Sequence, residues 1–185
     1  MRIIGGAHRG RALASIGKGD AAAHLRPTSD RVREALFNVL AGGYGDPASG
    51  ARVLDLFAGT GALGLEALSR GAATATFVES GRTALSLLRE NIARCGAGET
   101  ARVLPLDARR PGPNPGAPHD LVFLDPPYGK GLGEAALGAA LAGGWIAGGA
   151  LIVWEESAAI APPPGLTLLD QRRYGDTVFR FLGQG

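Results

Sequence analysis

The chain has 185 residues, of which 45% are hydrophobic and 19% charged, so a generally disordered chain is excluded and one ordinary domain with a full core is expected. Its single cysteine, Cys95, excludes an internal disulfide and a cysteine-based metal site, which favours the reducing cytoplasm. The net charge of only +2 is unevenly spread.

The first 33 residues are strongly basic. They hold seven Lys and Arg against two acids, a net +5, whereas the remainder holds 12 against 15, a net −3. This asymmetry indicates a polyanionic partner. We divide the chain into a basic arm, residues 1–27, and a domain, residues 28–185. The arginines that we expect to meet the polyanion are Arg2, Arg9, Arg11, Arg26 and Arg31.

The arm contains five glycines, so we expect it to be mobile until its partner orders it. The alternative is that residues 2–11 form a structural strand whose arginines only face solvent. The opening residues lack the apolar run of a signal peptide.

Strand and helix patterns alternate after the arm. A helix is expected to start at residues 27–29 and to stop at Gly42 and Gly43. The patterns that follow predict these elements: strand 53–57, helix 62–70, strand 74–79, helix 81–95, strand 102–106, strand 121–124, helix 134–141, strand 150–154, and a hairpin of strands 167–173 and 177–182.

This alternation predicts an α/β fold with a mainly parallel sheet, helices on both faces and a C-terminal antiparallel hairpin. Residues 135–154 carry no charge and meet a crude length rule for a membrane span, but two Gly-Gly pairs interrupt them. We interpret this stretch as a helix, a turn and a buried strand, and expect no membrane association. Ligands of such sheets bind at the carboxyl ends of the strands.

The first predicted strand runs through a glycine-rich turn into a helix. Gly59 and Gly61 permit a tight turn and close approach of the backbone to a ligand. About 20 residues later, Glu79 ends the next strand, where a carboxylate can bind two ribose hydroxyls. The candidate cofactor-binding residues are Asp55, Phe57, Ala58, Gly59, Thr60, Gly61, Glu79, Asp107 and Ala108.

Two kinds of cofactor compete for this turn. The glycine spacing, completed by Gly64, matches the dinucleotide fingerprint, so an NAD-dependent oxidoreductase is an alternative. Asp55 argues against it, because its negative charge would face a pyrophosphate but would favour the sulfonium and ammonium groups of S-adenosylmethionine. A third possibility is that this turn binds no cofactor and is purely structural, with Asp55 buried and hydrogen-bonded. Asp107 either contacts an adenine ring or caps a helix.

The segment from Asp125 to Tyr128 is the most informative in the chain. An apolar strand runs directly into an acid, two prolines and an aromatic ring, and the prolines hold the backbone rigid without offering N–H donors. A rigid turn capping a strand would be the non-functional reading. The candidate catalytic residues are Asp125, Pro126, Pro127 and Tyr128.

These groups match the needs of methyl transfer to the exocyclic amine of a base. That nitrogen is a poor nucleophile, because its lone pair is delocalised into the ring. The Asp125 carboxylate and the Pro126 carbonyl can accept its two N–H bonds and draw it towards tetrahedral geometry. Asp125 also stabilises the developing positive charge and can take the proton, while Tyr128 stacks on the base. This chemistry requires no metal.

Residues 55–61 and 125–128 resemble the cofactor and catalytic motifs of class I amino-methyltransferases. Residues 2–6, 9–11, 26–38 and 61–71 are similar to the corresponding segments of the RsmD family, and the resemblance covers nearly the whole chain. It implies a Rossmann-like class I methyltransferase fold, S-adenosylmethionine as cofactor, and methylation of guanine N2, the family target being guanine 966 of 16S ribosomal RNA. The implied partner is the bacterial small ribosomal subunit or its assembly intermediate, bound by a monomer.

Three other functions remain as alternatives. A DNA adenine-N6 methyltransferase would use the same chemistry but needs a target-recognition segment for which this chain has little room. A protein glutamine methyltransferase would favour Asn at position 125. A non-catalytic RNA-binding module would have no use for the glycine turn, Glu79 and Asp125 together.

Overall fold

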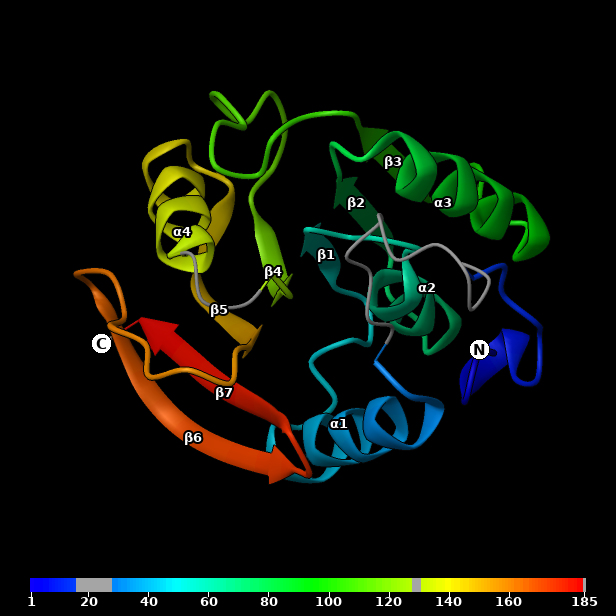
Figure 1. The fold of residues 1–185 in the computed structure, drawn as a ribbon, viewed down its shortest axis with the longest axis horizontal. Coiled ribbons are helices and arrows are strands. Elements are labelled where there is room, and N and C mark those ends of the chain that lie inside the picture. The colour runs from blue at the N-terminus through cyan, green and yellow to red at the C-terminus, as the bar shows by residue number, and fades with distance from the viewer. Residues whose placement is uncertain (16–27, 128–130, 185) are drawn as a thin grey trace.

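A seven-stranded mixed sheet forms the centre of the computed structural model, which describes residues 1–15, 28–127 and 131–184 (Figure 1). The strand order is β3-β2-β1-β4-β5-β7-β6. The first five strands pair in parallel, whereas β7 lies antiparallel to β5 and to β6. The strands are β1 Arg52–Leu56, β2 Thr74–Val78, β3 Ala101–Leu104, β4 His119–Leu124, β5 Ile146–Glu155, β6 Leu166–Tyr174 and β7 Thr177–Gln184.

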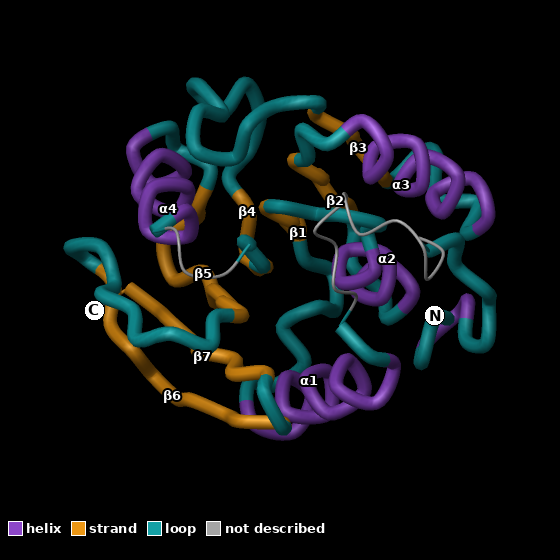
Figure 2. Tube along the Cα trace, viewed as in Figure 1, coloured by secondary structure: helices purple, strands orange, loops and turns teal. Residues whose placement is uncertain are grey.

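Helices cover both faces of this sheet. Figures 1 and 2 show α1 (Asp30–Gly43), α2 (Ala62–Ser69) and α3 (Arg82–Arg94) on one side and α4 (Leu132–Ala142) on the other. The predicted α/β architecture with its C-terminal hairpin is therefore confirmed. None of the described helices is long and apolar enough to cross a bilayer.

The central strands are apolar on both faces because each face packs under helices. On β1, Val53 belongs to the core cluster beneath α1, α2 and α3, whereas the next residue, Leu54, belongs to the cluster beneath α4. This double burial explains why the strands read as continuous apolar runs in the sequence rather than as alternating ones.

Most element boundaries lie within two residues of their predicted positions. Ser29 caps α1, and its Oγ accepts a hydrogen bond from the Val32 N–H at 3.3 Å. The largest difference is β5, which begins at Ile146 rather than at residue 150 and includes the Gly148-Gly149 pair. The pairing of β4 with β5 is irregular between His119 and Leu121, and such an irregularity accommodates glycines within a strand.

Residues 1–15 pack against the domain, contrary to the expected mobile arm. The backbone N–H of Ile3 donates to the Arg11 carbonyl at 2.9 Å, and the N–H of Gly10 donates to the Ile3 carbonyl at 2.8 Å. The side chains of Ile3 and Leu13 are buried in the core beneath α1, α2 and α3. The glycine content misled the prediction, because these apolar side chains bind the segment to the domain. Residues 16–27, Arg26 among them, lie outside the described residues.

Candidate active site

The glycine loop, residues 57–61, follows β1 and contains three residues with positive φ. Phe57, Gly59 and Gly61 have φ values of +59°, +54° and +80°. The positive φ of Gly61 favours glycine, and a Cβ there would also lie 2.4 Å from Leu88 Cδ1 on α3, so the Leu88 side chain would have to move. Sequence reasoning located this loop correctly. The close approach of Gly61 to Leu88 shows in addition that the loop packs against α3.

Glu79 lies at the carboxyl end of β2 and reaches across to this loop. Its Oε2 accepts the Gly59 N–H at 2.8 Å, and its Oε1 accepts the N–H groups of Ser80 and Gly81 at 2.8 and 2.6 Å. One carboxylate thus connects the glycine loop to the start of α3. Its oxygens have further lone pairs, so they can also accept ribose hydroxyls.

Asp55 is buried on β1 behind the loop. Its Oδ2 accepts the Gly64 N–H at 3.0 Å, which agrees with the prediction of a buried, hydrogen-bonded Asp55. Burial raises the pKa of Asp55 to about 8, the Gly64 hydrogen bond opposes that shift, and the charge of Glu79 adds to it. The carboxyl is therefore mostly neutral at pH 7, and the expected permanent negative charge is absent. It can ionise when a cation is placed beside it.

Asp107 follows β3 and forms a bidentate pair with Arg109, at 3.0 Å from Nε to Oδ1 and 2.6 Å from Nη2 to Oδ2. The hydrogen bond from Arg109 lowers the pKa of Asp107. A turn and a loop follow, so the alternative in which Asp107 caps a helix is wrong. Ala108 is buried beside this turn.

Asp125 directly follows β4 next to the glycine loop, and its N–H donates to the Leu56 carbonyl of β1 at 3.4 Å. Burial raises the pKa of Asp125 well above its usual value, and the charges of Glu155, Asp55 and Glu156 raise it further. Pro126 is buried and Pro127 is exposed. Tyr128 lies outside the described residues.

Glu155 and Glu156 lie at the carboxyl end of β5, and sequence reasoning missed both. Each is more than nine-tenths buried. The Thr28 hydroxyl donates to Glu155 Oε2 at 3.0 Å, and the Ala158 N–H donates to Glu156 Oε1 at 3.0 Å. Two acids directly after a predicted strand were a signal that could have found them. Together with Asp125 they make this end of the sheet acidic.

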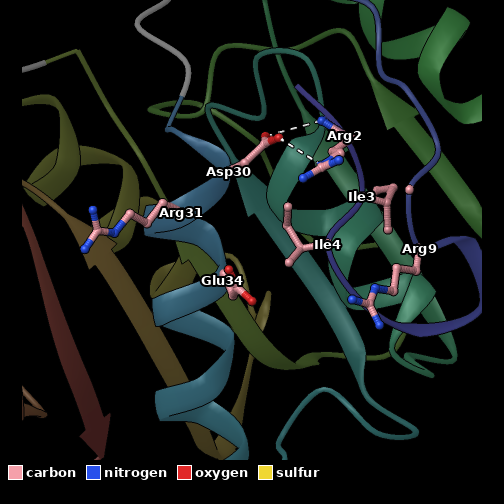
Figure 3. Close-up of a pocket in the computed structure, with 8 residues that line it drawn as sticks. Arg2, Ile3, Ile4, Arg9, Asp30, Arg31 and Glu34 are labelled. Atoms are coloured by element: carbon pink, nitrogen blue, oxygen red, sulfur yellow. Dashed lines mark hydrogen bonds and ion pairs between the residues drawn. The ribbon is translucent and has the colours of Figure 1, made fainter.

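Residues 1–15, which we call the N-terminal segment, line a cavity of about 360 Å³ together with the start of α1 (Figure 3). Arg2, Arg9 and Arg31 line it together with the acids Asp30 and Glu34. Figure 3 shows Arg31 on the opposite side of α1 from Arg2 and Arg9, so the three guanidinium groups do not converge on one point.

Two of the predicted RNA-binding arginines, Arg2 and Arg11, contact other groups of the protein. The Nε of Arg2 lies 3.6 Å from Asp30 Oδ2, and Arg11 donates to the Arg94 carbonyl at the end of α3. The Arg9 and Arg31 side chains are exposed. Within the described ranges, no group of three or more His, Cys, Asp and Glu side chains is arranged to hold a metal ion.

Comparison with known proteins assigns the chain to a family. Residues 1–183 match the family described as "Conserved hypothetical protein 95". The "Ribosomal RNA small subunit methyltransferase D" of Escherichia coli is 43% identical over 97% of this chain and 88% of its own length. The Haemophilus influenzae protein of the same name is 37% identical over 97% of this chain and 92% of its own length.

Solved structures agree with this assignment. The Escherichia coli protein yhhF superposes with a TM-score of 0.81 at 41% identity and covers all of this chain and 97% of its own. TrmN from Thermus thermophilus superposes with a TM-score of 0.67 at 25% identity, over 83% of this chain and 48% of its own. The fold is that of a class I methyltransferase, and the chain belongs to the RsmD family.

Proposed function

We propose that this protein transfers a methyl group from S-adenosylmethionine to the exocyclic N2 amine of a guanine in 16S ribosomal RNA of the small ribosomal subunit, with guanine 966 as the target. The observation that carries the proposal is the position of Asp125 and Pro126. They follow β4 directly beside the glycine loop of β1, in a chain whose relatives are named ribosomal RNA small subunit methyltransferase D.

The acids at this end of the sheet favour S-adenosylmethionine over a dinucleotide. Burial raises the pKa of Asp125, and the charges of Glu155, Asp55 and Glu156 raise it further, so these acids lie close together. A pyrophosphate would place two negative charges beside Asp55 and Asp125, whose pKa values are already raised, whereas a sulfonium and an ammonium would favour the ionised form of these acids. The glycine loop and Glu79 would hold the cofactor, with Ala108 and Asp107 near its adenine ring.

When bound, S-adenosylmethionine supplies a methyl group on a positively charged sulfur. Asp125 and the Pro126 carbonyl accept the N–H bonds of the guanine amine and direct its lone pair towards that methyl group. The nitrogen gains the methyl carbon and loses one proton. Because its pKa is raised, the ionised Asp125 is a stronger base than an ordinary aspartate, which suits it to accept this proton.

Two further groups of residues would bind the RNA. Tyr128 would stack on the target base, a contact of about 1–3 kcal/mol. The predicted RNA-binding arginines, with the exposed Arg9 and Arg31 foremost, would contact phosphates. The family relationship favours ribosomal RNA over DNA, and Asp rather than Asn at position 125 favours a base over a glutamine side chain.

The proposal is tested by identifying the methylated nucleoside. Purified protein is incubated with methyl-labelled S-adenosylmethionine and small ribosomal subunits from a strain that lacks the enzyme, and the digested RNA is separated by mass spectrometry. We expect label in N2-methylguanosine. Label in another nucleoside, or in DNA supplied in a parallel reaction, would contradict the proposed target.

A further inference from the structure

Asn91, in the last turn of α3, connects the glycine loop to the N-terminal segment. It is fully buried. Its Nδ2 donates to the Thr60 carbonyl in the glycine loop at 2.9 Å and to the Ala14 carbonyl in the N-terminal segment at 3.0 Å. Its Oδ1 accepts the Ala14 N–H at 2.6 Å. One side chain therefore satisfies backbone groups of the candidate cofactor loop and of the basic arm at once.

The two partners of Asn91 are remote in sequence. The same two regions also meet where the Thr60 hydroxyl donates to Met1 Sδ at 3.8 Å, but a thioether sulfur is a weak acceptor. Thr60 lies 31 positions from Asn91, and Ala14 lies 77 positions from it. Buried hydrogen bonds of this kind are costly to leave unmade, so a shift of the Thr60 carbonyl would strain the bonds to Ala14 as well. The amide has two N–H donors, and both are used by these two carbonyls.

The loop end of this connection lies close to the expected cofactor contacts. Thr60 stands between Gly59, whose N–H is held by Glu79, and Gly61, which packs on Leu88 of α3. A ligand that orders the loop therefore also fixes the Thr60 carbonyl. At the other end, Ala14 follows the stretch that contains Arg9 and Arg11.

We propose that Asn91 is a positioning residue that couples the cofactor loop to the basic arm, so that cofactor binding stabilises the arm in its RNA-binding position. This inference rests on the proposed function. It makes cofactor and RNA binding mutually favourable, because a coupling between two sites acts equally in both directions.

Other anchors of the N-terminal segment provide a matched control. The N–H groups of Ile4 and Gly5 donate to Glu66 at 2.8 Å each, and the Ser69 hydroxyl donates to the Gly5 carbonyl at 2.6 Å. Ser69 also accepts the His8 N–H at 2.9 Å. Both residues belong to α2, and none of these bonds involves the glycine loop. They hold the segment without reporting on the cofactor.

The experiment measures backbone amide hydrogen exchange of residues 11–15 with and without saturating S-adenosylhomocysteine. In the wild-type protein we expect the ligand to slow exchange at Ala14 by about fivefold or more, the low end of typical couplings. In Asn91→Asp, the acceptor for the Ala14 N–H remains, but the donors to the Thr60 and Ala14 carbonyls are both lost. The link to the loop is then broken, so the response should disappear. Asn91→Ala should also lack it, while Ser69→Ala should retain it.

Calorimetry of S-adenosylhomocysteine binding to each protein accompanies the exchange measurement. If wild-type and variants all bind the ligand and Asn91→Asp still slows at Ala14 as the wild-type does, the coupling role is refuted and the cofactor site stands. If the wild-type protein does not bind the ligand, the proposed function falls, and the inference falls with it.

Discussion

The glycine loop and the N-terminal segment are both candidate binding regions, but they are held in place in different ways. The loop is fixed mainly by groups close in sequence, with the Glu79 carboxylate 20 positions from Gly59 and the Asp55 carboxylate nine positions from Gly64. The N-terminal segment is held by Glu66, Ser69 and Asn91, which lie 61 to 77 positions from their partners. A locally fixed region can be recognised as a motif, whereas a region fixed by distant side chains cannot.

This comparison predicts that changes at the sheet edge will affect chemistry and cofactor binding, and that changes in the N-terminal segment will affect RNA. The largest effect is expected at Asp125. Asp125→Ala should lower single-turnover methyl transfer by about 100-fold or more, because an acceptor for the transition state is lost. Cofactor affinity, measured by calorimetry, should remain close to that of the wild-type protein. Near-normal turnover in this variant would remove Asp125 from the mechanism.

The second effect concerns cofactor affinity. Glu79→Ala should weaken S-adenosylmethionine binding by about 10-fold to 100-fold, the range for hydrogen bonds to a charged group. Glu99→Ala, at an exposed position after α3, is the matched control and should bind normally. Equal affinities of both variants in calorimetry would show that Glu79 only supports the loop.

The third effect is a pH dependence at the acidic edge. Below pH 8 the free protein holds a proton on Asp55, and a cationic ligand favours its release, so affinity for S-adenosylmethionine should rise with pH from 6 to 8. The rise is at most about tenfold per pH unit for one group. S-adenosylhomocysteine lacks the sulfonium charge and should show a weaker rise.

Asp55→Asn tests the source of this pH dependence. The amide oxygen can still accept the Gly64 N–H, but it has no proton to release, so the rise for S-adenosylmethionine should flatten. The pKa of Asp125 is also raised, so it contributes with the same sign, but the residual slope should be small because Asp125 is not among the residues that hold the cofactor. Identical slopes in wild-type and variant would mean that Asp55 does not sense the ligand charge.

The smallest effect is expected in the N-terminal segment. Replacing Arg9 and Arg11 by Ala should raise the KM for small ribosomal subunits a few-fold and flatten its dependence on salt, because phosphate contacts are lost. Cofactor affinity without RNA should not change. Replacing Arg172 and Arg173 on β6 by Ala removes the same charge from a distant edge. If both double variants lose affinity equally, net charge and not the segment attracts the RNA.

The sequence predicted the fold well because its strands and helices carry strong local patterns. Residues 121–124 are an apolar run between two aspartates, and residues 53–57 are apolar except for Asp55. Both stretches form central parallel strands. The glycine loop, Glu79 and Asp125 were placed at one end of the sheet because parallel strands end at the same edge.

The contacts that depend on tertiary structure were not predictable. The sequence does not distinguish Glu66 from an ordinary helix residue, yet Glu66 is fully buried and accepts N–H groups from Ile4 and Gly5. The ionisation of Asp55 could not be inferred either, since its raised pKa comes from burial, which a sequence does not show. The sequence left the state of residues 1–15 open between a mobile arm and a structural strand, because it does not show that Ile3 and Leu13 are buried.

The most direct test of the central claim is mass spectrometry of 16S ribosomal RNA from cells in which this gene is deleted and then restored. We predict that N2-methylguanosine at the target position disappears on deletion, returns with the wild-type gene, and stays absent with the Asp125→Ala gene. Persistence of the methyl group in the deletion strain, or its return with the Asp125→Ala gene, would contradict the account.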